Sequence, residues 1–359
     1  MTVGLMIVLA LVLILPFTFR VIEHNLEYFL FTMGLLATVI SGSLSVHLIS
    51  HIFGNRLLYF ITAAVLIAGL LFNYSIQKIH WMVGTILKRI PLKLFIFVMV
   101  TVLGLASSLI TAIIAALVLV EILHALPLKH KTKVKLAIVS CFSIGLGAVL
   151  TPIGEPLSTI VVSSLKADFW YLFHLIGVYV VPGVIAMGLL SIFILHRDER
   201  KEAADSTAAT SEETAEAICF KEESVEIKKE EELKAVFIRA FKIFVFVVAL
   251  ELLGAGFKPL VNTYIIHLDS RLLYWINMTS AVLDNATLAA AEISPSMTVI
   301  QIKAILMGLL ISGGMLIPGN IPNIISAGKL NIKSREWAIT GAPIGLALLV
   351  IYFVAIFLF

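Results

Sequence analysis

The sequence predicts an all-α membrane protein with about eight transmembrane helices and two oppositely oriented re-entrant hairpins. Of its 359 residues, 60% are hydrophobic and only 14% are charged, and the mean hydropathy is +1.05. This composition lies outside the range of soluble globular proteins. The apolar runs are long and continuous, without the alternation of a transmembrane β-strand, so the spanning segments are expected to be helices.

Eight apolar runs are long enough to cross a hydrocarbon core of about 30 Å. They lie at 3–19, 28–49, 57–76, 136–165, 170–195, 235–257, 298–329 and 336–359. Two further apolar stretches, 92–124 and 266–294, are interrupted near the middle by small and polar residues, SSLIT at 107–111 and LDNAT at 283–287. Each stretch is either one long broken helix or two half-helices that meet at a polar tip.

The distribution of charge decides between these two options through the positive-inside rule. Basic residues flank the stretch 92–124 on both sides, with four lysines between 129 and 135, so both of its ends are expected in the cytoplasm. The segment 197–242 holds 9 of the 26 basic and 13 of the 23 acidic residues, which indicates a cytoplasmic linker. The consistent threading places both termini outside, and the stretch 266–294 then enters the membrane from the external face.

A weak internal repeat supports two units of opposite orientation. ASSLITA at 106–112 resembles SAVLDNA at 280–286 with an offset of 174, and TPIGEPL at 151–157 resembles IPGNIPN at 317–323 with an offset of 166. The predicted organisation is an inverted-topology repeat with two Pro-broken helices. Its parts are two additional N-terminal transmembrane helices at 1–56; a first repeat at 57–195 with a helix, a cytoplasmic-side hairpin at 92–124, a broken helix at 136–165 and a helix at 170–195; a charged linker at 196–234; and a second repeat at 235–359 with a helix, an external-side hairpin at 266–294, a broken helix at 298–329 and a helix at 336–359.

Both broken helices carry two prolines four residues apart, with glycine beside them. Proline removes a backbone donor and opens the helix, which frees carbonyl groups at membrane depth. Such backbone is tolerated in a membrane only where it lines a cavity or binds something. Many secondary transporters build their substrate site from discontinuous helices at the interface between two repeats, so these breaks are candidate binding elements.

Two acidic residues lie at these interruptions. Asp284 is at the tip of the second hairpin, and Glu155 stands between Gly154 and Pro156 in the first broken helix. Desolvation favours the protonated form of such a carboxyl and a bound cation favours the ionised form, and this competition is sufficient for antiport. The alternatives are structural: Asp284 holds its turn together with Asn285, and Glu155 accepts backbone amides freed at a helix end.

Neutral oxygen ligands are expected to complete a site for cations and protons. The candidates are Asn285, Thr287, Asn320 and Asn323 in the second half, and Thr151, Ser158, Ser108 and Thr111 in the first half. Glu251 is either a residue of a proton pathway or an interfacial carboxylate, and Glu121 and Glu292 are expected nearer the interfaces. We expect no cofactor and no bound metal beyond a transported monovalent cation.

The succession of tip, Gly/Pro-rich break, LDNAT tip and PGNIPN break resembles the ion transporter superfamily, which contains sodium/proton antiporters, arsenite permeases and divalent-anion/sodium symporters. The closest likeness is to an uncharacterised prokaryotic family of predicted cation transporters, and it covers 80–195 and 235–359. The resemblance implies one cation site for each tip and break pair, an elevator-type movement, a homodimer and a prokaryotic plasma membrane. The first break has GEP where Gly-Asn-Pro-Pro or Gly-Ser-Pro-Pro is common in the superfamily, so the resemblance implies that Glu155 stands where its members have a neutral ligand.

The expected function is secondary active transport that exchanges Na⁺ for protons. The alternative is cation- or proton-coupled transport of an oxyanion or small carboxylate. No Arg or Lys stands at either tip or break, so an anion would have only helix N-termini to neutralise it. The motifs of intramembrane aspartyl, serine and metal proteases are absent, so we do not expect an enzyme. The expected partners are the lipid bilayer and the transported ions, and no nucleic acid.

Overall fold

The structure is a computed structural model of the whole chain. It describes residues 1–19, 22, 25–54, 58–59, 62–63, 66–67, 70, 90–208, 233–281 and 285–358. These residues form fourteen α-helices and three short 3-10 or π segments, and none of them is in a β-strand. The predicted all-α class is therefore confirmed. The expected helix at 57–76 and the 209–232 part of the expected linker fall largely or wholly outside the described residues.

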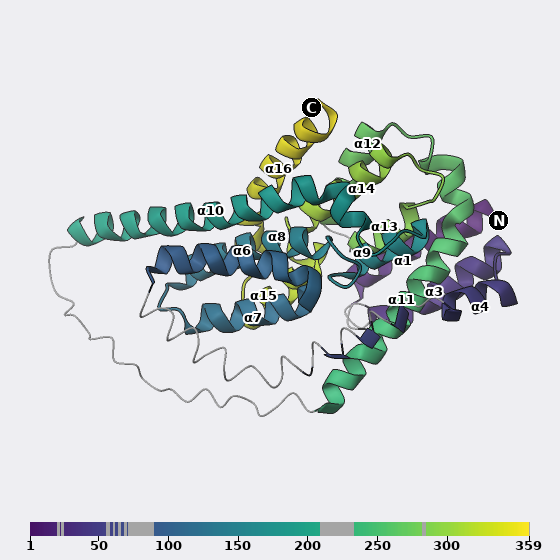
Figure 1. Cartoon of the computed structure of the whole chain (residues 1–359), viewed down its shortest axis with the longest axis horizontal. Coiled ribbons are helices and arrows are strands. Elements are labelled where there is room, and N and C mark those ends of the chain that lie inside the picture. Colours follow the sequence, from purple (N-terminus) through teal and green to yellow (C-terminus); the bar gives the residue numbers. More distant parts are fainter. Residues whose placement is uncertain are drawn as a thin grey trace.

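In the described part of the chain, three helices precede the first hairpin, and they pack against a helix of the second half (Figure 1). They are α1 (Thr2–Thr18), α3 (Leu26–Ser41) and α4 (Val46–Gly54). α3 lies close against α11 (Leu233–Leu260) because Gly34 has no side chain: a Cβ there would be 2.9 Å from the carbonyl oxygen of Ala249. Small residues allow such close approach of helices in membranes. The Lys242 ammonium and the Glu27 carboxylate, 2.5 Å apart, join the same two helices.

The first half contains a helical hairpin, a broken helix and a long helix. Its elements are α6 (Leu92–Ile110), α7 (Ala112–Ala125), α8 (His130–Ala148), α9 (Pro156–Leu165) and α10 (Tyr171–Ala208). α6 and α7 meet at Thr111 and run back alongside each other (Figure 1). α10 continues well beyond the predicted end at 195, because the residues that follow are mostly good helix formers such as Glu, Lys, Arg and Ala.

The second half follows the same order after α11. Its elements are η1 (Val261–Ile265), α12 (Ser270–Ile276), η2 (Asn277–Ala281), α13 (Asn285–Glu292), α14 (Val299–Gly313), η3 (Ile317–Gly319), α15 (Ile321–Leu330) and α16 (Ser334–Phe357). The predicted spans 136–165 and 298–329 are each divided by their break, into α8 and α9 and into α14 and α15. α9, α14 and α15 have 10, 15 and 10 residues, and each is shorter than the roughly 20 apolar residues that cross a bilayer. α8 has 19 residues, but three lysines occupy its first two turns.

The backbone of the two broken helices is nearly the same. α9 and α15 have ten residues each, and their N-cap residues have φ and ψ of −155° and 162° at Glu155 and −153° and 147° at Asn320. Both helices end in a left-handed residue, Lys166 (φ 51°) and Asn331 (φ 54°). Each of these pairs is separated by 165 residues, one fewer than the offset of the prolines. The structural counterpart of Glu155 is therefore Asn320.

The two hairpins are also held by corresponding hydrogen bonds. The Ser107 hydroxyl donates to the carbonyl oxygen of Ile144 at 3.0 Å, and the Ser280 hydroxyl donates to that of Leu309 at 3.3 Å. The two acceptors are again 165 residues apart, and the two donors 173. The same contact between a hairpin and its neighbouring helix thus occurs once in each half.

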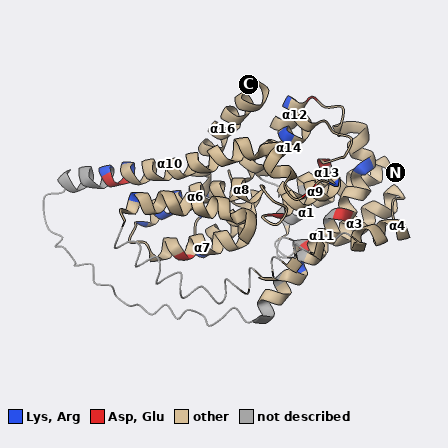
Figure 2. Cartoon of the chain, viewed as in Figure 1, with Lys and Arg blue, Asp and Glu red and all other residues tan. Residues whose placement is uncertain are grey.

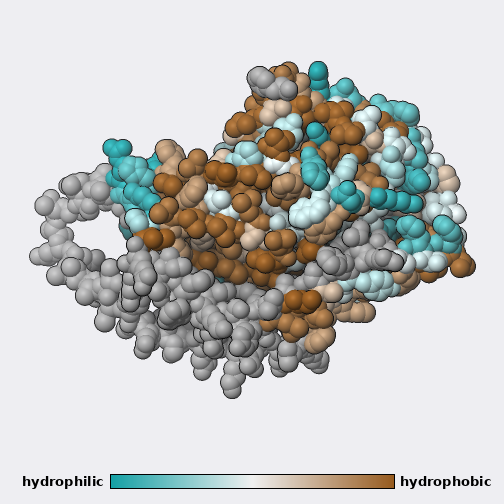
Figure 3. Space-filling view, viewed as in Figure 1, coloured by the Kyte–Doolittle hydropathy of each residue, from teal (hydrophilic) through white to brown (hydrophobic). Residues whose placement is uncertain are grey.

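Three described helices are long and apolar enough to cross a membrane, Leu92–Ile110, Tyr171–Arg200 and Ser334–Phe357, which indicates a multi-pass membrane protein. Hydrophobic side chains cover the middle of α6 and α10 (Figure 3), and charged side chains gather at one end of α10 (Figure 2). There the Lys93 ammonium lies 2.7 Å from the Glu199 carboxylate, and the Lys135 ammonium lies 2.6 Å from that of Asp198. Lys93 belongs to the first turn of α6, so the hairpin begins at this charged end.

Candidate functional site

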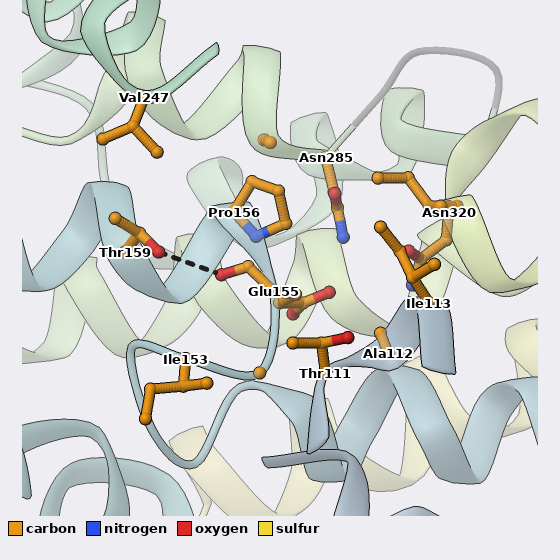
Figure 4. A pocket seen from close by; sticks show the side chains of 13 residues that line it. Thr111, Ala112, Ile113, Ile153, Glu155, Pro156, Thr159, Val247, Asn285 and Asn320 are labelled. Carbon is orange, nitrogen blue, oxygen red and sulfur yellow. Dashed lines mark hydrogen bonds between the residues drawn. The ribbon is translucent and has the colours of Figure 1, made fainter. Parts of the chain in front are cut away.

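One cavity lies where the two hairpins and the two broken helices meet (Figure 4). It is lined by Thr111, Ala112, Ile113, Ile153, Gly154, Glu155, Pro156, Thr159, Val247, Asn285, Ala286, Asn320 and Ile321. Its volume is about 30 Å³, counted as the space that the centre of a water molecule can occupy. One water needs about 10 to 15 Å³ on this measure, so the cavity has room for an ion with very few waters.

Four helices begin at this cavity. α7, α9, α13 and α15 each contribute their first or N-cap residues to its lining. The first backbone N–H groups of a helix have no partner within the helix, and the helix dipole adds partial positive charge at the same end. The cavity is therefore a place where a carboxylate is stabilised by backbone groups from both halves of the chain.

Glu155 provides this carboxylate. Its residue is only 5% exposed, and it is the N-cap of α9 with Pro156 at the first helical position. The backbone oxygen of Glu155 accepts hydrogen bonds from the hydroxyls of Ser158 at 2.6 Å and Thr159 at 3.3 Å. These bonds fix the backbone, so the carboxylate is held in the cavity, where it points toward the side chains of Thr111 and Asn285 (Figure 4).

The amides of Asn285 and Asn320 face the same cavity from the second half. Each residue is 3% exposed, and the Nδ2 atom of Asn285 has no hydrogen-bond partner within the described part of the chain. The Asn320 amide fits against α8 because Gly145 has no side chain: a Cβ there would lie 2.8 Å from its Nδ2 atom. The cavity thus combines one carboxylate with amide groups that offer both oxygen and nitrogen.

Thr111 lies at the first hairpin tip, beside the first break, and its backbone is strained. Its φ and ψ are 75° and 148°, a region that is adopted almost only by glycine and is costly for a β-branched residue. The next residue, Ala112, donates its N–H to the carbonyl oxygen of Gly154 at 2.8 Å. Strain of this kind persists where the surrounding structure enforces it and is concentrated at functional sites.

We expect the Thr111→Gly substitution to raise thermal stability and to lower transport activity. Glycine removes strain of about 1 to 3 kcal/mol and loses only a few tenths through the weaker helix cap. The hydroxyl that faces the cavity is lost at the same time. Thermal melting in detergent and transport in proteoliposomes measure the two effects. A melting temperature below that of the wild type would contradict the strain at this position.

The structure divides the sequence-predicted residues into two groups. Glu155, Thr111, Asn285 and Asn320 line the cavity together. Ser108, Thr151, Ser158 and Asn323 do not line it, and they donate hydrogen bonds to backbone carbonyl groups of the breaks and the first tip instead. Their observed contacts stabilise the irregular backbone around the site.

Two predicted residues cannot be placed by their side chains. Asp284 lies outside the described residues, between the described Ala281 and Asn285. Thr287 belongs to α13, but its side chain is outside the described part. The sequence positions of the two hairpins differ by 173 residues. By this offset, Asp284 is the counterpart of Thr111.

Two features were missed by the sequence reasoning. Thr159 lines the cavity one helical turn after Glu155, a spacing of four residues that the sequence does contain. Glu292, which was expected nearer an interface, is only 8% exposed and accepts a hydrogen bond from the Asn277 amide at 2.8 Å. This pair joins the two arms of the second hairpin, and no local motif in the sequence indicates it.

The long apolar helices indicate a multi-pass helical membrane protein. The cavity between the two hairpin tips and the two broken helices is its buried polar site. The chain belongs to the family described as "Protein of unknown function (DUF1646)", whose model matches residues 2–359. No curated protein matches the chain. Among the residues that the structure describes, no group of three or more His, Cys, Asp or Glu side chains could hold a metal ion.

Proposed function

We propose that this protein is a secondary active transporter of the ion transporter superfamily that exchanges Na⁺ for protons by an elevator-type alternating-access mechanism. The observation that carries the proposal is the lining of one cavity by both breaks, the first hairpin tip, and Asn285 and Ala286 of the second interruption. Irregular backbone from two related halves that meets in one place is how many secondary transporters form their site.

The repeated backbone supports an inverted arrangement of the two halves. The matching caps of α9 and α15 and the matching bonds of Ser107 and Ser280 relate one half to the other. Together with the positive-inside rule, this relation favours two re-entrant hairpins that enter from opposite faces of a prokaryotic plasma membrane, with both termini outside. The proposal includes a homodimer, as the resemblance to the superfamily implies.

The chemistry of exchange follows from one buried carboxylate in a small cavity. An ionised Glu155 is compensated by Na⁺, which the oxygens of Asn285, Asn320 and Thr111 help to coordinate. A protonated Glu155 needs no cation, because the buried charge is gone. Asp284 is proposed to act in the same way at the second tip. Since each acid carries either a proton or Na⁺, transport of one drives transport of the other in the opposite direction.

The second candidate function is proton- or cation-coupled transport of a small oxyanion or carboxylate. The convergence of four helix N-termini favours it, because helix N-termini bind anions. Against it, the described residues that line the cavity include no Lys or Arg, and Glu155 already places a negative group among the helix ends. The space of about 30 Å³ also suits a monatomic ion better than a carboxylate.

Proteoliposomes with an imposed sodium gradient test the proposal. We expect the wild-type protein to move protons, measured with an enclosed pH-sensitive dye, and we expect Asp284→Asn to abolish this movement while the protein stays monodisperse. Unchanged exchange in this variant would remove Asp284 from the mechanism. Two results together would favour the second candidate. The protein would take up a labelled oxyanion or carboxylate in a sodium-dependent way, and it would move no protons when that anion is absent.

A further inference from the structure

A second, smaller cavity adjoins the central one along α9. It is lined by Thr159, Ile160, Ser163, Ser164, Val247 and Glu251. Thr159 and Val247 line both cavities, so the two spaces share part of their walls. The second cavity lies toward the C-terminal end of α9, which the positive-inside threading places at the external face. It therefore extends from the central site in one direction only.

The hydroxyl groups of Thr159 and Ser163 lie one turn apart along one face of α9, in the walls of the two cavities. Glu155, Thr159 and Ser163 are spaced four residues apart, which places them above one another on a helix, over about 12 Å at 1.5 Å per residue. The Thr159 hydroxyl donates to the carbonyl oxygen of Pro152 at 2.7 Å. The Ser163 hydroxyl donates to the carboxylate of Glu251 on α11. A line of polar groups thus leads from one carboxylate to another.

The fold itself does not require this line. With the offset of 165 residues, the counterparts of Thr159 and Ser163 in α15 are Ile324 and Gly328, which carry no hydroxyl. Serine and threonine in apolar helices commonly bond to their own helix, and this accounts for part of the bonding of Thr159. It does not account for Ser163, whose hydroxyl bonds to another helix.

We propose that Glu251 is a proton relay that connects the central cavity with the external end of α9 through Ser163, Thr159 and intervening water. This inference rests on the proposed exchange of Na⁺ for protons. A proton leaves the Glu155 carboxyl group, each hydroxyl or water accepts one proton and donates another, and Glu251 accepts the last one to become a carboxylic acid. No electron is transferred, and the reverse sequence returns the proton to Glu155.

Among the residues that the structure describes, few other groups near Glu251 could carry the proton. No other titratable side chain of this part of the chain lines the second cavity. On the neighbouring helices, the charged residues of the described chain are Glu155 and Lys166 at the two ends of α9, Glu292 at the end of α13 and Glu27 at the start of α3. Of these, Glu155 alone lies on the proposed line.

Two transport modes separate a relay from a cation-binding or structural role. Exchange of Na⁺ for protons needs the relay, whereas exchange of radioactive Na⁺ for unlabelled Na⁺ moves no proton. We expect Glu251→Gln to slow the first mode by about a hundredfold or more, because a positioned proton-transfer group contributes on that order, and to leave the second mode unchanged. Ser163→Ala is expected to show the same pattern, and Glu251→Asp is expected to restore proton movement in part.

Ser191→Ala is the matched control, because Ser191 is a buried serine that bonds to the carbonyl oxygen of Gly188 in its own helix and is not among the residues that line either cavity; both modes should match the wild type. Normal proton exchange in both Glu251→Gln and Ser163→Ala would overturn the relay, and so would equal loss of both modes in a monodisperse Glu251→Gln protein. If Glu251→Gln does not fold, Ser163→Ala decides between these outcomes. Absence of both modes in the wild type would instead overturn the proposed function, and the relay with it.

Discussion

We expect the Glu155→Gln substitution to reduce sodium-driven proton movement by about a hundredfold or more. Glutamine has nearly the same shape, but it can neither release a proton nor compensate a cation. Removing one member of a buried ion pair typically costs about 3 kcal/mol or more, and each 1.4 kcal/mol is about tenfold in an equilibrium constant. The initial rate of proton movement in proteoliposomes under a sodium gradient measures the effect.

Glu121→Gln provides the control for this experiment. Glu121 is a half-buried carboxylate on α7 of the first hairpin, and it does not line the cavity. Its substitution is expected to leave the exchange rate close to that of the wild type. Sodium-driven proton movement at the wild-type rate in folded Glu155→Gln would show that the cavity carboxylate does not carry the coupled proton.

The Gly147→Ala substitution is expected to prevent stable folding or to lower stability by about 3 kcal/mol or more, the range of severe overpacking. A Cβ at Gly147 would lie 1.8 Å from the carbonyl oxygen of Gly104. The oxygen belongs to the backbone of α6 and the Cβ would be attached directly to the backbone of α8, so neither atom can move aside and the two helices would have to separate. That movement would also break the bond from the Ser143 hydroxyl to the carbonyl oxygen of Val100, 2.9 Å long, across the same interface.

Gly328→Ala is the matched control for this change. Gly328 is also inside a helix, α15, and a Cβ there would have no heavy atom within 4 Å. Since alanine is a better helix former than glycine, by up to about 1 kcal/mol, this variant should be as stable as the wild type or more stable. The melting temperature of each variant is measured from the loss of the monodisperse peak in size-exclusion chromatography after heating. Equal melting temperatures for Gly147→Ala and the wild type would contradict the close packing of the first hairpin on α8.

The sequence predicted those parts of the fold that depend on composition and on strong backbone signals. Continuous apolar runs indicated helices, and the polar interruption at 107–111 contains Thr111, where α6 ends and α7 begins. The register between the two halves could not be obtained from the prolines, because Pro156 is the first residue of α9 whereas Pro322 is the second of α15. The helix caps, which depend on backbone conformation, give the correct offset.

The residues of the cavity were predictable where their chemistry is rare in an apolar helix. A carboxylate beside a proline break, as at Glu155, is costly and therefore informative. Hydroxyl residues are common and bond to backbone as readily as to a ligand, so the sequence could not separate Thr111, which lines the cavity, from Ser158, which bonds to a carbonyl oxygen. The contact of Glu292 with Asn277 depends on the way the second hairpin folds back, which no local pattern encodes.

Sodium binding to the purified protein tests the central claim most directly, because it needs no gradient and no membrane. Isothermal titration at several pH values measures the affinity. If one cavity carboxylate holds either Na⁺ or a proton, the dissociation constant for Na⁺ should rise by about tenfold for each unit of pH below the point where that proton binds. Glu155→Gln should abolish binding at this carboxylate and so lower the number of Na⁺ ions bound per chain. Sodium binding that is independent of pH and unchanged in Glu155→Gln would contradict the account.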